Sequence, residues 1–194
     1  MLAIIKDNKI EKTANNIRQL FPNTSFPTSG ADAEWKAAEG VKDVVQGEQK
    51  DQRYYFVTQG DITLVDGVPT QQYSNIAKRL ENEDAKDADG NQLYVQVWDE
   101  DKKQMVDSSE KLVNQGVKTH CLGEIKQTAN KLLAKTDWMV IRKAERDVAI
   151  PSGTATYRAA VITECARLEG AISSASDVDA LKTVMQGQNW PTED

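Results

Sequence analysis

Short runs in which apolar and polar residues alternate fill the first half of the chain and are separated by turn-forming residues. Asp7-Asn8 divides two such runs near the N-terminus, and Asp66-Gly67 divides residues 62–65 from residues 68–73. Asp-Gly tolerates the positive φ that a tight hairpin turn needs. The pattern therefore predicts two β-hairpins, the second with the stronger turn signal.

Between these hairpins, residues 15–21 and 31–38 carry apolar residues at helical spacing. They predict short helices, stopped by Pro22 and Gly40. Residues rich in β-branched and aromatic side chains predict strands at 41–45 and 54–58. Strands and short helices spaced this closely indicate a small antiparallel sheet.

The middle of the chain is more polar. Residues 74–80 predict the start of a helix, and the acidic residues 81–89 predict a linker or exposed loop. Residues 92–98 alternate strictly and, with residues 104–106 across a polar turn, predict another hairpin.

After residue 106 the apolar period changes from two to about three and a half. Asp107 and Glu110 have the spacing of a capping box and predict the start of a helix over 107–136. Two interior glycines, Gly116 and Gly123, would each cost it about 1 kcal/mol, so its apolar stripe should be packed. Further helices are predicted at 154–172 and 177–185.

These elements predict an α+β fold in which a small antiparallel β-rich N-terminal half with short helices precedes a C-terminal helical hairpin. The predicted domains are 1–77 (β-rich), 78–106 (linker plus hairpin) and 107–194 (helical).

Composition narrows the classes of partner. Of 194 residues, 39% are apolar and 28% charged, and the formal net charge is −6. The acidic balance without a basic cluster argues against nucleic-acid binding, which needs clustered Lys and Arg. The longest apolar runs span only a few residues, so no membrane span is predicted.

Two cysteines, Cys121 and Cys165, fall within predicted helices. A disulfide is possible if these helices pack together, but two reduced core residues are the favoured interpretation. His120 is the only histidine, and its neighbour Cys121 points about 100° away on a helix, which makes a poor nucleophilic pair.

No other pattern points to chemistry. Residues 83–91 resemble a calcium loop, but Ala85 and Gln96 stand where its first and last carboxylates belong, so an acidic turn is favoured. Phosphate-binding glycine loops and nucleophile elbows are absent. The sequence therefore predicts no catalytic residue, no metal site and no cofactor.

Two tryptophans are candidates for contacts with a partner. Trp138 follows Thr136-Asp137 at a helix end, where it could pack over that helix or form a binding hot spot, and packing is the favoured alternative. Trp190, beside Pro191, would be exposed apolar surface unless a partner covers it.

The sequence Leu132-Leu-Ala-Lys-Thr-Asp-Trp138, followed by Ile150-Pro151 and Tyr157-Arg158-Ala-Ala-Val161, resembles the C-terminal domain of bacteriophage tail assembly chaperone-like proteins. Leu20-Phe-Pro-Asn-Thr-Ser-Phe-Pro27 is similar to a phrase in the N-terminal halves of such proteins. This chain departs from the pattern in the β segment 92–106 and in a basic loop after Trp138.

The resemblance implies a non-enzymatic protein that binds tail-fibre or baseplate proteins in the host cytoplasm during assembly. The alternative is a structural subunit retained in the virion tail, in which helix 107–136 could join copies into a homo-oligomer. The residues expected to contact a protein partner are Trp138, Arg142, Arg146, Tyr157, Arg158 and Trp190.

Overall fold

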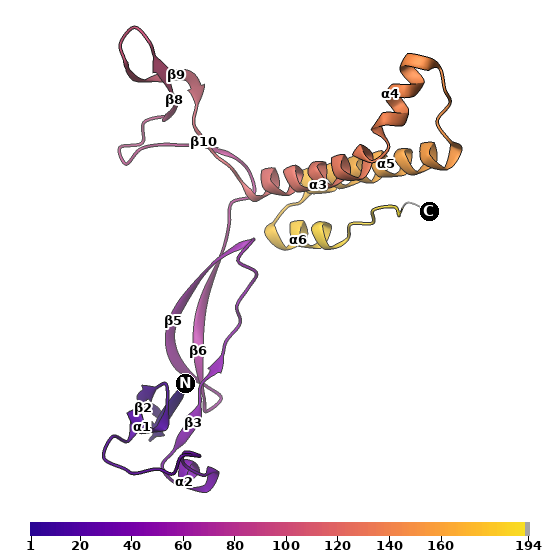
Figure 1. Ribbon diagram of the computed structural model, residues 1–194. Helices are drawn as coiled ribbons and strands as arrows, with labels where there is room; N and C mark the ends of the chain where they lie inside the picture. The colour runs from indigo at the N-terminus through magenta and orange to yellow at the C-terminus, as the bar shows by residue number, and fades with distance from the viewer. Residues whose placement is uncertain (193–194) are drawn as a thin grey trace. The chain divides into compact units, whose positions relative to one another are not determined.

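The computed structural model describes residues 1–192 and shows an α+β chain, which confirms the predicted fold class. Strands occupy the N-terminal part and helices the C-terminal part (Figure 1). The chain divides into two compact units, Met1–Ala77 and Lys78–Asp194.

A three-stranded antiparallel sheet opens the first unit. β1 (Leu2–Lys6) lies between β2 (Lys9–Ala14) and β3 (Val41–Asp43). Asp7 and Asn8 form the β1–β2 turn with φ of 47° and 57°, which confirms the first predicted hairpin.

Two short helices cover this sheet, at the positions that the sequence predicted. α1 (Ile17–Leu20) starts at Asn16, and α2 (Ala33–Ala38) starts at Asp32, whose carboxylate accepts the Trp35 N–H at 2.7 Å. The Trp35 ring meets the Phe21 and Phe26 rings edge-on, with centroids 4.9 and 5.0 Å away. The buried core here consists of Leu2, Ile4, Ile17, Leu20 and Val41.

The second sheet has the order β4 (Val45–Gln46), β6 (Val68–Ala77), β5 (Tyr55–Val65). β5 and β6 form the predicted Asp66-Gly67 hairpin, and β4 pairs with β6 in parallel. The helix predicted at 74–80 is wrong, since β6 runs to Ala77 and residues 78–80 are irregular. Ile76 pairs there with Phe56, so cross-strand pairing overrides local helix propensity.

The second unit begins with two further strand pairs. β7 (Glu83–Asp84) pairs with β10 (Val113–Asn114), and the predicted hairpin is β8 (Tyr94–Asp99) with β9 (Gln104–Lys111). The predicted acidic turn forms around Asp87, whose carboxylate accepts backbone N–H groups of Asp89 and Asn91 at 2.9 and 2.8 Å. The Asn91 side-chain amide also donates to this carboxylate, at 3.0 Å. This bond is the largest cause of the lowered pKa of Asp87, and the backbone bonds add to it.

The predicted helix 107–136 is too long, because α3 spans Val117–Ala134. Asp107 is not a helix cap: it lies in β9 opposite Gln96, whose side-chain amide donates to its carboxylate. The helix starts after Gly116, where a Cβ would lie 2.2 Å from the Leu80 carbonyl oxygen. Only glycine permits this approach of two backbone segments.

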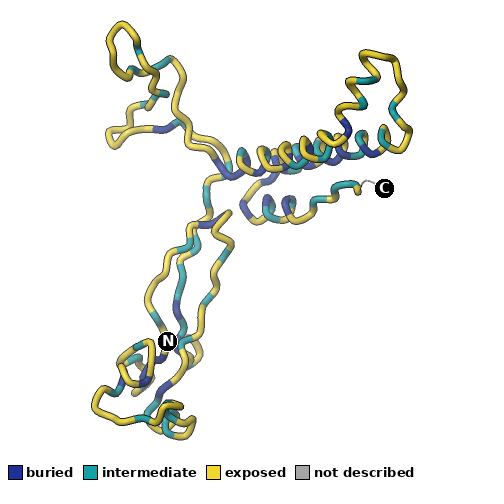
Figure 2. The backbone as a smooth tube through the Cα atoms, in the orientation of Figure 1, coloured by how far each residue is buried: buried dark blue, intermediate teal, exposed yellow. Residues whose placement is uncertain are grey.

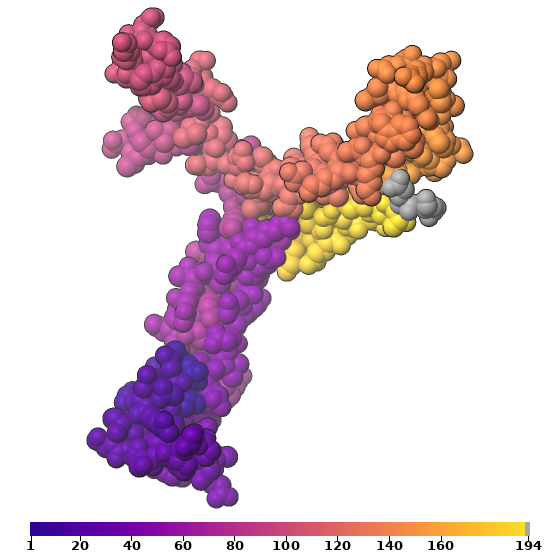
Figure 3. Space-filling view, viewed as in Figure 1, coloured from indigo at the N-terminus to yellow at the C-terminus, as the bar shows by residue number. Residues whose placement is uncertain are grey.

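Three helices form the packed layer of this unit: α3, α5 (Ser152–Ser174) and α6 (Val178–Gln186). α3 and α5 run antiparallel, since Lys118 Nζ at one end donates to the Ser173 carbonyl oxygen at 2.9 Å. α6 packs along α5, and the space-filling view shows the yellow C-terminal segment lying against this helical layer (Figure 3). The bounds of α5 and α6 confirm the two predicted C-terminal helices within two residues.

Buried residues recur along each of these three helices (Figure 2). Val117 and Ile125 of α3 are 8% and 0% exposed, and Leu112 lies outside the helix. These two residues of the predicted 107–136 stripe therefore pack inside the chain. The homo-oligomer expected through this helix stays a prediction. Cys121 and Cys165 form no disulfide, as favoured from the sequence.

Candidate protein-binding surface

Arg158 closes the carboxyl end of α3. Its guanidinium donates to the Leu133 carbonyl oxygen at 2.9 Å and to the Thr136 hydroxyl at 2.7 Å, and it pairs with the Asp137 carboxylate at 2.9 Å. The last carbonyls of a helix have no partner within it, so a guanidinium here satisfies acceptors that would otherwise need water. Thr136 is 2% exposed, so the bond to its hydroxyl is shielded from water, whereas the Asp137 side chain is 53% exposed.

Tyr157 and Trp190, two of the residues predicted to contact a partner, pack within the chain. Tyr157 is 8% exposed and forms a core cluster with Ala129 and Val161, and Trp190 lies against this cluster. The Trp190 indole N–H donates to the Gln188 side chain at 2.8 Å. The Tyr157 hydroxyl is buried and has no hydrogen-bond partner among residues 1–192. Tyr157, Arg158 and Trp190 are thus parts of the scaffold.

A helix, α4 (Asp137–Arg146), replaces the basic loop that the sequence predicted after Trp138. Asp137 lies in its first turn, and Lys143 and Arg146 lie in its last turn. These charges oppose the helix dipole at each end and stabilise the helix. Asp147 ends it in the left-handed conformation, with φ of 54°.

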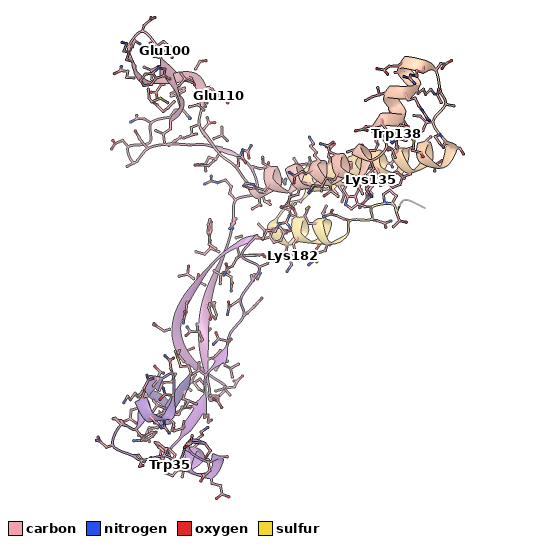
Figure 4. The ribbon with its side chains drawn as sticks, in the orientation of Figure 1. Trp35, Glu100, Glu110, Lys135, Trp138 and Lys182 are labelled. Carbon is pink, nitrogen blue, oxygen red and sulfur yellow. The ribbon has the colours of Figure 1, made fainter. Side chains whose placement is uncertain are left out.

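α4 does not bury its apolar side chains. All ten of its residues are described, and none of them is buried. Trp138 is 52% exposed and Ile141 57% exposed, which excludes the favoured prediction that Trp138 packs over the preceding helix. Trp138 lies at the first turn of α4 (Figure 4). A ten-residue helix is marginal in water by itself, so a covering partner would stabilise it.

The Arg142 guanidinium lies over the Trp138 ring, 4.9 Å from its centroid. Its Nε is buried there and has no hydrogen-bond partner in the described part of the chain. Arg142 and Arg146 also form no ion pair within residues 1–192. We call the residues Trp138, Ile141, Arg142 and Arg146 the α4 surface. Trp and Arg dominate the binding energy of protein interfaces.

Glu164 is a buried charge with a structural role. It is 8% exposed, accepts two hydrogen bonds from Arg167 at 2.7 Å, and accepts the Asn189 backbone N–H at 2.7 Å. The Arg167 hydrogen bonds lower the pKa of Glu164; burial opposes this effect and the Asn189 bond adds to it. The charge therefore ties α5 to the segment after α6.

The described residues offer little else for chemistry. Within residues 1–192, no three side chains of His, Cys, Asp or Glu gather as metal ligands, and no helix is long and apolar enough to cross a bilayer. A groove of about 310 Å³ lies between α3 and α5, and its apolar lining includes Leu133, Ile162 and Cys165. Lys126 and Glu169, which form an ion pair with each other, also line it.

Of the six predicted contact residues, Trp138, Arg142 and Arg146 lie together on α4, whereas Tyr157, Arg158 and Trp190 pack inside. Sequence analysis missed Ile141, although its spacing of three from Trp138 on a capped helix could have revealed it.

No protein-family model, curated protein or solved structure matches the chain.

Proposed function

We propose that this chain is a non-enzymatic bacteriophage tail protein that binds tail-fibre or baseplate proteins during assembly, as a chaperone does. The observation that carries the proposal is α4, an amphipathic helix with no buried residue among its ten and with Trp138 and Ile141 more than half exposed. Exposed aromatic and aliphatic side chains beside arginines are the composition of a protein-binding hot spot.

The sequence pattern shared with tail assembly chaperone-like proteins supports this proposal. Its Thr, Asp and Arg positions are Thr136, Asp137 and Arg158, and the Arg158 guanidinium bonds to both of the others where α3 ends and α4 begins. The Trp position, Trp138, is the first exposed aromatic residue beyond this junction. The pattern thus fixes the start of α4 and presents its tryptophan. The proposed partner is a protein in the host cytoplasm, with no nucleic acid, membrane or cofactor involved.

The second candidate function is a structural subunit retained in the virion tail. The β8–β9 hairpin favours it, because Val97, Trp98 and Met105 are 43%, 54% and 53% exposed. A hairpin of two strands is marginally stable in water, and permanent neighbours in a particle would cover these residues.

Coexpression tests the chaperone proposal. Each tail-fibre and baseplate protein would be produced with the wild-type chain, with the R142E/R146E variant, or alone. We expect at least one tail-fibre or baseplate protein to be soluble only when it is produced with the wild-type chain. Equal solubility in all three conditions for every tail protein would overturn the proposal.

Mass spectrometry of purified particles separates the two candidates. A chaperone is absent from particles but present in producing cells, whereas a structural subunit has a fixed copy number relative to the major tail protein.

A further inference from the structure

The α4 surface carries positive charge that the chain does not neutralise. Arg142, Lys143 and Arg146 form no ion pair within residues 1–192, and Glu145 is the one acidic residue in the last two turns of α4. The guanidinium of Arg142 is already oriented by Trp138, so a carboxylate could bind it with little loss of side-chain entropy.

The β8–β9 hairpin carries the opposite charge next to apolar side chains. Trp98 pairs with Met105 across the strands, and Asp107 lies on the same face opposite Gln96. Glu100 lies at the hairpin turn (Figure 4). Neither Glu100 nor Asp107 has an ion pair in the described part of the chain. In the turn, Lys102 pairs with Asp99 at 3.3 Å, which leaves Lys103 as its other cation.

The two surfaces also agree in length. Trp138 to Arg146 spans eight helical residues, about 12 Å at 1.5 Å per residue. From Gln104, where β9 begins, to Asp107 the strand rises by three residues, about 10 Å at 3.4 Å per residue. Each surface therefore offers one short strip with apolar side chains and unpaired charges, of opposite sign on the two strips.

We propose that the α4 surface of one copy binds the Trp98–Met105 face of the β8–β9 hairpin of a second copy. The inference rests on α4 being a protein-binding surface, as proposed above, and names this chain as one occupant. Such a contact joins two different surfaces, so it is heterologous and generates a ring or an open chain of copies. The terminal copy of an open chain keeps a free α4 surface for another protein.

Sedimentation velocity of the full chain over a range of concentrations tests this inference. We expect the wild type to self-associate, and more weakly at high salt. The variants R142E/R146E and E100K/D107K should each weaken self-association about tenfold or more, because two charge pairs become repulsive. All four residues are exposed or half-buried, so thermal unfolding should show that both variants fold.

Mixing the two variants is the decisive step. R142E/R146E keeps the acidic wild-type hairpin, and E100K/D107K keeps the basic wild-type α4, so these two surfaces can form the wild-type contact. The acidic α4 of the first variant is also complementary to the basic hairpin of the second. We expect the mixture to associate. K9E/K131E, which changes the formal charge by as much as R142E/R146E at exposed lysines elsewhere, should associate as the wild type does.

A wild type that stays monomeric at all concentrations, or a mixture that does not associate, would overturn this inference. If R142E/R146E loses solubilisation of a tail protein while the wild type is monomeric, only the self-association is wrong. If the wild type self-associates through α4 but solubilises no tail protein, the proposed function is wrong and this inference stands.

Discussion

The guanidinium of Arg158 donates a hydrogen bond of 2.7 Å to the hydroxyl of Thr136, across the junction between α3 and α4. The two residues are 22 positions apart in the sequence, and both belong to the motif on which the proposed relation to tail assembly chaperone-like proteins rests. Their contact gives this pattern a structural cause, since it anchors the helix that presents Trp138.

Replacing Arg158 with methionine should destabilise the chain by about 2–3 kcal/mol, because the Leu133 carbonyl and the buried Thr136 hydroxyl lose a charged donor. Urea unfolding measures this change. Arg146→Met is the matched control, since Arg146 has no ion pair within residues 1–192, and it should change stability by less than about 0.5 kcal/mol. Equal effects of the two substitutions would contradict the role given to Arg158.

Two glycines that look alike in the sequence should respond in opposite ways to alanine. Gly116→Ala places a Cβ against the backbone of Leu80 and Glu81 and should cost about 3 kcal/mol or more. Gly123 lies within α3, and a Cβ added there would meet no atom within 4 Å outside the backbone of its own helix. Gly123→Ala should therefore stabilise the chain by about 0.5–1 kcal/mol. Thermal unfolding of both variants checks the sign, and a stabilising Gly116→Ala would contradict the close approach.

Removing the Tyr157 hydroxyl should not destabilise the chain. Tyr157→Phe removes a buried group that has no hydrogen-bond partner among residues 1–192, so it should be neutral or stabilise by about 1 kcal/mol. Tyr157→Ala empties the core and should cost about 3–4 kcal/mol. Trp138→Ala, at a 52% exposed residue, should cost less than about 1 kcal/mol. Denaturant midpoints of the three variants measure the order of their stabilities, with Tyr157→Phe the highest and Tyr157→Ala the lowest. A strongly destabilising Tyr157→Phe would show that the hydroxyl has a hydrogen-bond partner.

Stability should fall in acid partly through Glu164. Its pKa is lower in the folded chain than its usual value of 4.5, mainly because of Arg167. Its contribution is therefore present above pH 4.5 and lost as the pH falls through the lower folded pKa. Glu164→Gln should cost about 1–2 kcal/mol at pH 7, and this cost should shrink as the pH falls below 4.5. A difference between wild type and variant that stays constant from pH 7 to pH 3 would contradict this assignment.

The hairpins were predictable from their turn residues, because Asp66 and Gly67 both tolerate the positive φ that a tight turn requires. The start of α3 was not predictable in the same way. Leu112 and Val113 continue the helical period by coincidence, and Asp107 and Glu110 imitate a capping box while lying in β9. The helix begins after Gly116, whose close approach to Leu80 is a contact between distant residues that a local pattern does not contain.

The candidate surface was half predictable. Trp138, Arg142 and Arg146 stand at intervals of four, which places them on one face of a helix. The sequence does not indicate whether another element of the chain covers that face. Tyr157 and Trp190 are of residue types that also anchor interfaces. Only the packing of α3 against α5 shows that Tyr157 lies in the core and that the half-buried Trp190 lies against it.

The most direct measurement is site-specific photo-cross-linking from position 138 in phage-producing cells, with the same cross-linker at Gln127, an exposed residue of α3, as the control. The proposal predicts that position 138, and not position 127, cross-links to a tail-fibre or baseplate protein in addition to other copies of this chain. Cross-links from position 138 that match those from position 127, or that include no tail protein, would contradict it.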